Sequence, residues 1–367
     1  MYFCKRRMKQ RNHTFDFLCG LCIIRMVMLH TFQYTGHINQ GWWKELMAWS
    51  FFLMCFFFFK AGYFNRTVSG PTLPYLADRT KRLFVPYICC GLIGTALFWF
   101  FRWFLEGRYS RNPIKFAWEH IYNCSDFYGN TPIWFIFSFF MMYVAVHFVE
   151  KLRHAPPLWV APHRKKRTKL LSSAIVYTMV LLLPWVSYWL WRKGNPLWLN
   201  LNNVCMGIFF FYLGRTWRWL TMHLGRRWEF VLSVVLLSAF VTGNLLWHGE
   251  YTMHSNAFAG NPWGAIVNTI LVACGLSGLF LSLRLGRVPL IGYIGQHSMV
   301  YFALHFPVLF IYRNIWLYFH TVMRSNVLHA VAALVLIFAF CTFITPYFER
   351  VPFLSGRWKN KSKSPQA

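Results

Sequence analysis

The chain has 367 residues, of which 57% are hydrophobic and only 13% are charged, and its formal net charge is +28. A soluble domain carries roughly a quarter charged residues, so this composition excludes an ordinary soluble protein. A strongly positive charge would also suit a protein that binds nucleic acid. The distribution of the basic residues along the chain decides between a membrane protein and a nucleic-acid-binding protein.

Apolar runs of about 17 to 25 residues are long enough to cross a bilayer as helices. The sequence contains ten, and the sixth is the weakest because asparagines crowd its start. In chain order the predicted spans are Phe15–Phe32, Glu45–Phe64, Leu83–Phe104, Ile133–Val149, Leu170–Trp191, Leu197–Leu213, Phe230–Trp247, Trp263–Leu283, Val288–Tyr312 and Val327–Tyr347. The pattern predicts an all-α, polytopic membrane helix bundle of about ten transmembrane helices.

The basic residues follow this span pattern. With the N-terminus inside the cell, the inner segments hold 27 of the 38 Lys and Arg residues, the outer loops hold 8, and three lie within spans. Lys and Arg accumulate in cytoplasmic loops, so both termini are predicted to be cytoplasmic, and we expect no nucleic-acid partner. The expected parts are a basic N-terminus (1–14), an integral-membrane domain (15–348) and a basic cytoplasmic tail (349–367).

Span one contains three ionisable side chains, Asp16, Arg25 and His30, each of which requires a function or a partner inside a membrane. Asp16 and His30 are separated by about 21 Å along a helix, so the carboxylate cannot orient the imidazole. Asp16 alone would suit the positive end of the helix dipole, and His30 alone would suit an interfacial position. Arg25 needs either a ligand or an interhelical partner.

Further basic residues lie near the predicted inner surface. Lys60 comes near the inner end of span two, where its side chain is long enough to reach water. Arg79 and Arg82 would share a face of a helix, with Lys81 between them. Two arginines at this spacing suit a phosphate or pyrophosphate, although the positive-inside rule accounts for them equally well.

Several stretches together resemble acyltransferase family 3, a family of integral-membrane acyltransferases that act on glycans or lipid-linked sugars. Asp16 followed by His30 matches the shape of that family's first helix, and the other stretches match its later motifs in order. These other stretches are Phe58–Phe64, Arg79–Tyr87, Thr131–Phe135 and Gly295–Val308. The similarity runs from about Thr14 to Tyr347, which is almost the whole chain.

The resemblance implies transfer of an acyl group from cytoplasmic acyl-CoA, with acetyl favoured because it is the family's commonest group. It implies His30 as catalytic base and a glycan or lipid-linked sugar as acceptor, in a multi-pass protein of the bacterial inner membrane. We expect membrane lipid as a partner, no permanently bound cofactor and no metal site. The expected donor-binding residues are Arg79, Arg82, Lys81, Arg25 and Lys60, and the expected structural or cavity-lining residues are Asp16, Trp134, Ser298, Tyr301 and His305.

One position departs from the family pattern. The family usually has an arginine three residues after the aspartate, where this chain has Cys19. The departure leaves open a divergent enzyme or an inactive scaffold of an envelope complex. A transporter or flippase is a further alternative, but the sequence shows no inverted repeat and no pair of broken helices.

Overall fold

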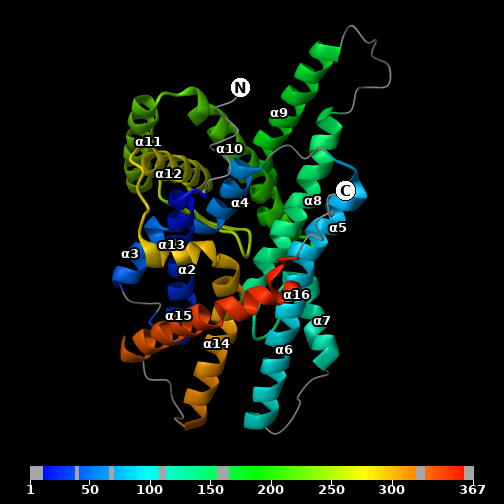
Figure 1. Cartoon of the computed structure of the whole chain (residues 1–367), viewed down its shortest axis with the longest axis vertical. Helices are drawn as coiled ribbons and strands as arrows, with labels where there is room; N and C mark the ends of the chain where they lie inside the picture. Colours follow the sequence, from blue (N-terminus) through cyan, green and yellow to red (C-terminus); the bar gives the residue numbers. More distant parts are fainter. Residues whose placement is uncertain are drawn as a thin grey trace, which may run out of the picture. The chain divides into compact units, whose positions relative to one another are not determined.

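A computed structural model describes residues 11–37, 41–65, 70–106, 113–154, 165–319 and 327–358. The described residues are almost entirely helical (Figure 1). The elements are α2 (His13–Tyr34), α3 (Gly41–Trp49), α4 (Leu53–Phe64), α5 (Thr72–Arg79), the π-helix η1 (Thr80–Phe84), α6 (Val85–Glu106), α7 (Pro113–Cys124), the 3-10 helix η2 (Thr131–Ile133), α8 (Trp134–His154), α9 (Lys165–Arg192), the 3-10 helix η4 (Trp198–Asn203), α10 (Val204–His223), α11 (Arg226–Leu246), β1 (Gly249–Thr252), β2 (Ala257–Gly260), α12 (Pro262–Ser282), α13 (Pro289–Gln296), α14 (Ser298–Phe319), α15 (Val327–Arg350) and α16 (Pro352–Ser355).

Among the described residues, nine helical segments are long and apolar enough to cross a membrane. They are His13–Tyr34, Gly41–Phe64, Thr72–Phe104, Thr131–Arg153, Leu170–Arg192, Arg226–Leu246, Pro262–Ser282, Ser298–Leu317 and Val327–Arg350. These nine correspond to nine of the ten predicted spans, so the all-α polytopic fold is confirmed. The cytoplasmic placement of both termini stays a prediction.

The predicted sixth span, Leu197–Leu213, is wrong in its first part. Residues Trp198–Asn203 form η4, in which Leu199 and Asn200 have left-handed backbone conformations. The Asn202 side chain bonds both backbone groups of Leu197, which replaces the helical bonds of this segment. The helix α10 begins only at Val204, and it is not among the nine because its second half carries arginines.

Two other predicted spans are interrupted in the structure. The second breaks between α3 and α4, and the ninth breaks at His297 between α13 and α14. The third is longer than predicted, because α5 and η1 precede α6 without leaving the helical path. Hydropathy detects such segments as single apolar runs, since a break of one to three residues hardly changes the mean.

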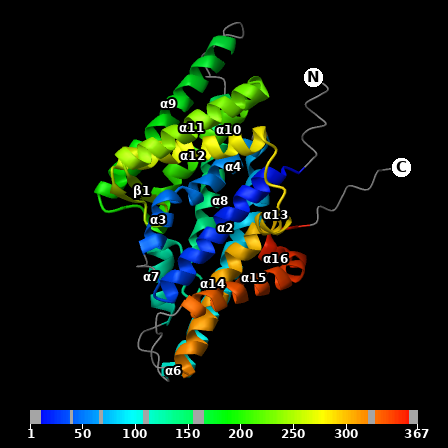
Figure 2. The same cartoon turned by 90° about the vertical axis from the view of Figure 1, so that its left-hand side faces the viewer.

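The chain divides into two compact units. Unit 1 comprises Met1–Phe32, Ile38–Asn65 and Phe209–Ser298, and unit 2 comprises Gln33–His37, Arg66–Ile208 and Met299–Ala367. In unit 1 the helices α11 and α12 lie side by side (Figure 2), and the antiparallel hairpin of β1 and β2 precedes α12. Gly62 packs against the Phe211 carbonyl and Gly214 against the Phe59 carbonyl, so small residues let α4 and α10 approach closely.

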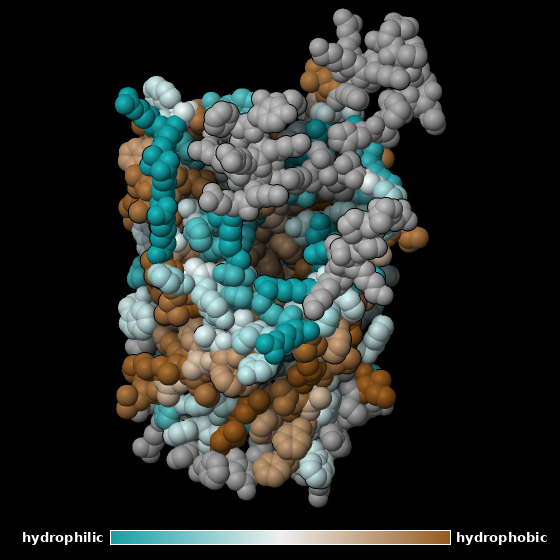
Figure 3. Space-filling view, viewed as in Figure 1, coloured by the Kyte–Doolittle hydropathy of each residue, from teal (hydrophilic) through white to brown (hydrophobic). Residues whose placement is uncertain are grey.

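Unit 2 is organised around the first half of α6. The loop that follows α7 packs on this half, since the Tyr87 hydroxyl donates to the Ser125 carbonyl (2.9 Å) and Gly91 faces the Phe127 ring. This loop belongs to the predicted outer loop between spans three and four, and it returns almost to the start of α6. Figure 3 shows brown, apolar side chains gathered over α15, whose exposed residues include Val335 and Phe343, as expected for a helix that faces lipid.

Candidate active site

The helix α2 carries Asp16 and His30 near its opposite ends. It is continuous over His13–Tyr34, so the two side chains are separated by about 21 Å along its axis. Asp16 is paired with Arg11, whose Nε lies 2.5 Å from the carboxylate Oδ2. Asp16 therefore has a partner at its own end of the helix and does not orient His30.

Close backbone contacts hold α2 in place within unit 1. A Cβ atom on Gly295 of α13 would lie only 1.7 Å from the Asp16 carbonyl oxygen. A Cβ on Gly20 would lie 2.0 Å from the Ile291 carbonyl oxygen. The glycines of α2 and α13 are thus required by the approach of the two backbones, which fixes the helix that carries His30.

Lys60 lies near the end of α4, as predicted, and its side chain is half-buried beside α2. Its ammonium group lies close enough to the thiol of Cys19, a residue that is fully buried in α2, for the charge to act on that thiol. Lys60 also lies near the thiol of Cys22, one turn further along the same helix. A cation from α4 is therefore present beside position 19 of α2.

Arg25 has an interhelical partner within unit 1. Its Nε donates a hydrogen bond of 3.2 Å to the Ser50 hydroxyl, at the break between α3 and α4. The Ser50 hydroxyl in turn donates to the Leu46 carbonyl of α3. Arg25 therefore has an interhelical partner, one of the two predicted alternatives. The role of Arg25 in donor binding stays a prediction.

The two arginines of the basic motif take different environments, although their spacing predicts one shared face. The Arg79 guanidinium carbon lies 4.3 Å from the centre of the Tyr143 ring and 5.1 Å from that of Tyr75. The Tyr75 ring stacks on His147 with centroids 4.3 Å apart. Arg79 is therefore packed between two tyrosines of α5 and α8, a geometry that a planar guanidinium favours.

Arg82 and Lys81 are exposed, in contrast to Arg79. The Arg82 Nε lies 2.7 Å from Asp78 Oδ1, and both side chains are more than 40% exposed. Arg82 lies within the π-helix η1, which inserts one residue into the helical register between Arg79 and α6. We call residues Arg79–Phe84 the basic turn.

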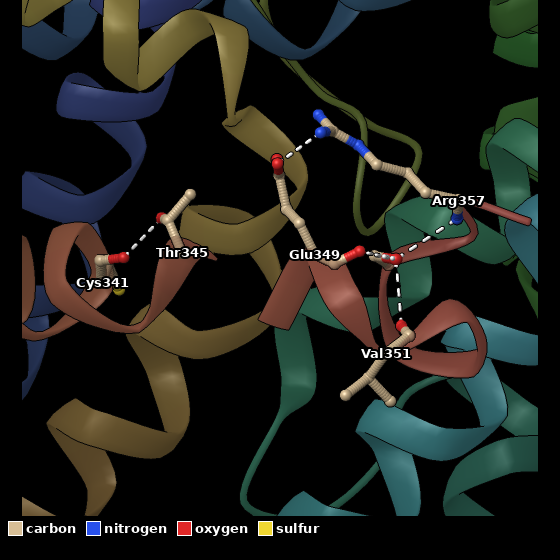
Figure 4. Close-up of polar contacts among 6 residues, drawn as sticks. Cys341, Thr345, Glu349, Val351 and Arg357 are labelled. Atoms are coloured by element: carbon tan, nitrogen blue, oxygen red, sulfur yellow. Dashed lines mark hydrogen bonds and ion pairs between the residues drawn. The ribbon is translucent and has the colours of Figure 1, made fainter. Parts of the chain in front are cut away.

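The last described residues of the chain pack on the basic turn. The short helix α16 lies against α6 and η1 (Figure 1), and the Trp358 indole N–H donates to the Lys81 carbonyl at 2.9 Å. Figure 4 shows the contacts that shape this segment: an ion pair of Arg357 with Glu349, and a Ser355 hydroxyl that bonds the Val351 carbonyl. We call residues Glu349–Trp358 the C-terminal brace.

Tyr301 and His305 belong to the core of unit 2. The Tyr301 hydroxyl bonds the Thr342 hydroxyl at 2.7 Å. His305 is fully buried, and its Nδ1 donates to the carbonyls of Tyr301 (2.9 Å) and Phe302 (3.0 Å), which fixes the tautomer with the proton on Nδ1. Trp134 is buried at the start of α8.

Asn130 is a buried residue at the centre of unit 2. Its Nδ2 donates to the Ala303 carbonyl of α14 (3.0 Å) and to the Cys90 carbonyl of α6 (3.2 Å). In a regular helix the Ala303 carbonyl would accept from residue 307, but Pro307 has no N–H. Asn130 thus supplies the donor that Pro307 lacks, and it ties two helices together.

The structure sorts the predicted site residues into two groups. Unit 1 holds Asp16, Arg25, His30, Lys60 and Ser298, and unit 2 holds Arg79, Lys81, Arg82, Trp134, Tyr301 and His305. Sequence reasoning missed the tyrosines around Arg79, as well as Asn130 and Trp358. Only Asn130 has a local indication, since it directly precedes the Thr131–Phe135 stretch.

The fold and these ionisable groups inside the helices define a multi-pass integral membrane protein. A family model described as an acyltransferase domain matches residues 12–346, nearly the whole chain. The chain belongs to acyltransferase family 3, and it is a membrane acyltransferase. Searches of curated proteins and of solved structures give no match.

Family membership gives the contact between Lys60 and Cys19 a specific meaning. The family usually has an arginine at the position of Cys19, and here the neighbouring helix α4 supplies a cation next to that position. A positive charge thus lies beside position 19 in this chain, although the residue at that position is a cysteine.

Proposed function

We propose that the protein is an O-acyltransferase that moves an acetyl group from cytoplasmic acetyl-CoA to a hydroxyl of a cell-surface or lipid-linked glycan. The observation that carries this proposal is the family match over residues 12–346, which includes His30 on the continuous helix α2. We place the protein in a bacterial inner membrane, where acyl-CoA meets one face and glycan precursors meet the other.

The basic turn is the proposed binding site for the nucleotide phosphates of the donor. Arg82 and Lys81 expose their charges, and Arg79 is held rigidly between Tyr75 and Tyr143. Arg79 is only partly buried, and guanidinium N–H groups suit phosphate oxygens. Lys60 and Arg25, the other predicted donor-binding residues, belong to unit 1.

His30 is the proposed general base. The neutral imidazole takes the proton of the acceptor hydroxyl while the hydroxyl oxygen attacks the thioester carbonyl carbon. The carbon–sulfur bond then breaks, the acetyl group stays on the sugar oxygen, and the imidazolium returns its proton to the CoA thiolate. The Tyr301 hydroxyl is engaged with Thr342, and Ser298 follows Gly295, which packs against Asp16 at the other end of α2 from His30, so neither Tyr301 nor Ser298 is assigned to the oxyanion.

The test of this function is a His30→Ala variant in cells that lack the wild-type gene. We expect acetylation of surface glycans, measured by mass spectrometry, to fall by at least about 100-fold, the lower range for loss of a general base. His223→Ala is the matched control, since it removes an exposed histidine at the end of α10. Unchanged acetylation in the His30 variant, at equal protein level in the membrane, would contradict the proposal.

A further inference from the structure

We infer that the C-terminal brace is part of the donor site, because it holds the basic turn in the π-helical register that orients Arg79 and Arg82. This inference rests on the proposed binding of acyl-CoA by the basic turn. It adds positioning residues that lie outside the matched family segment, which ends at residue 346.

The basic turn has a backbone carbonyl without a helical donor. The Val85 N–H, which would serve the Lys81 carbonyl in an α-helix, donates instead to the Thr80 carbonyl. The next N–H in a π-helix would come from residue 86, but Pro86 has none. The Trp358 indole supplies the donor, with Nε1 at 2.9 Å from the Lys81 oxygen.

The next carbonyl of the basic turn meets the brace as well. The α-helical donor to the Arg82 carbonyl would again be Pro86, which has no N–H. Gly356 lies against this carbonyl, so that an added Cβ would be 2.2 Å from the Arg82 oxygen. Gly356 also has a φ of +68°, which glycine adopts without strain. Position 356 therefore requires glycine for two reasons, the absence of a side chain and the positive φ.

The brace is itself held in one conformation by the bonds drawn in Figure 4. The Arg357 guanidinium pairs with Glu349, the last acidic residue of α15. The Ser355 hydroxyl accepts from the Arg357 N–H (3.2 Å) and donates to the Val351 carbonyl (3.0 Å). These bonds present Gly356 and Trp358 to the basic turn as a preformed unit.

The register of the basic turn decides where Arg79 points. Loss of the inserted π residue would rotate α5 relative to α6 by about 100°, the angle of one residue in an α-helix. Such a rotation would carry Arg79 and Tyr75 together, since both belong to α5, and would separate the Arg79 guanidinium from the Tyr143 ring of α8. The brace is thus expected to act on donor affinity through the arginines, without touching the reacting atoms.

The experiment uses the full-length protein in nanodiscs with three variants. Trp358→Phe keeps an aromatic ring and removes the N–H. Arg79→Ala removes the side chain through which the brace is proposed to act, and the third variant combines both. Trp228→Phe, on an exposed tryptophan of α11, is the matched control. The readouts are the Kd for CoA, the kcat and donor KM of acetyl transfer, and hydrogen exchange of residues 80–90.

We expect Trp358→Phe to weaken CoA binding and raise the donor KM by about 3- to 10-fold, the effect of one hydrogen bond, with kcat unchanged. Exchange in residues 80–90 should rise, and the control should match the wild type. In the Arg79→Ala background the Trp358 substitution should add less than about 2-fold, since the two residues act on one property.

Other results would overturn the inference. Wild-type CoA affinity in Trp358→Phe, or a loss that simply multiplies with that of Arg79→Ala, would show that the brace does not act through the arginine. Absence of CoA binding in the wild type would overturn the proposed donor, and with it the donor role of the brace. Exchange in residues 80–90 would then still show whether Trp358 holds the π-helix, which separates the two failures.

Discussion

Two segments adjoin the first half of α6, and their polar side chains differ in exposure. The basic turn leads directly into α6, and the loop after α7 packs on it. The basic turn leaves Lys81 and Arg82 exposed, whereas the loop after α7 buries Ser125, Asp126 and Asn130. Both segments use partners that are distant in sequence, Trp358 for the basic turn and Ala303 for the loop. The difference indicates that the exposed charges of the basic turn are available to a ligand, whereas the buried polar groups of the loop hold helices together.

The largest effect is expected in the buried loop. Asn130→Ala would leave the Ala303 carbonyl without a donor and open a small cavity, so the free energy of unfolding should fall by roughly 2–4 kcal/mol. The measurement is the thermal unfolding midpoint in detergent. Asn314→Ala is the control, because its amide bonds the Phe310 carbonyl of its own helix. Equal losses in both variants would contradict the special role of Asn130.

An intermediate effect is expected at the basic turn, on ligand binding instead of stability. Arg79→Lys keeps the charge but loses the planar group between Tyr75 and Tyr143, so the Kd for CoA should rise about 10-fold. Arg82→Lys should raise it only about 2-fold, because the exposed Arg82 has no such packing. Titration calorimetry checks both, and equal effects would show that burial of Arg79 is irrelevant to the donor.

The smallest effect on the free energy of unfolding is expected at an exposed aspartate, Asp78, and a buried aspartate serves as the comparison. Asp78→Asn should change the free energy of unfolding by less than about 0.5 kcal/mol, because the pair with Arg82 is exposed. CoA binding should tighten about 2-fold, since a negative charge leaves the phosphate site. Asp126→Asn, in the buried pair with His120, should cost more than about 1 kcal/mol. A larger loss at Asp78 than at Asp126 would reverse the comparison.

The sequence motifs identify candidate site residues, but they do not predict how these residues are arranged in space. The spacing of Arg79 and Arg82 predicts one shared face, but Arg79 packs against two tyrosines whereas Arg82 is exposed. The aromatic partner Tyr143 lies 64 positions further along the chain in another helix, where no periodicity links it to Arg79. Lys60 was expected near water from its place in its own helix, and its contact with Cys19 depends on how α4 packs beside α2.

The sequence by itself determined the membrane fold, the family and His30 near one end of the first helix. Hydropathy, helix rise and motif order are local properties, which a chain carries whatever its tertiary contacts. The tertiary structure alone decided how the basic turn is completed, because Pro86 removes a backbone donor and Trp358, 277 positions after Lys81, restores it. A proline in the sequence predicts a backbone carbonyl that lacks its N–H donor. The residue that supplies the donor instead depends on which helix ends pack together.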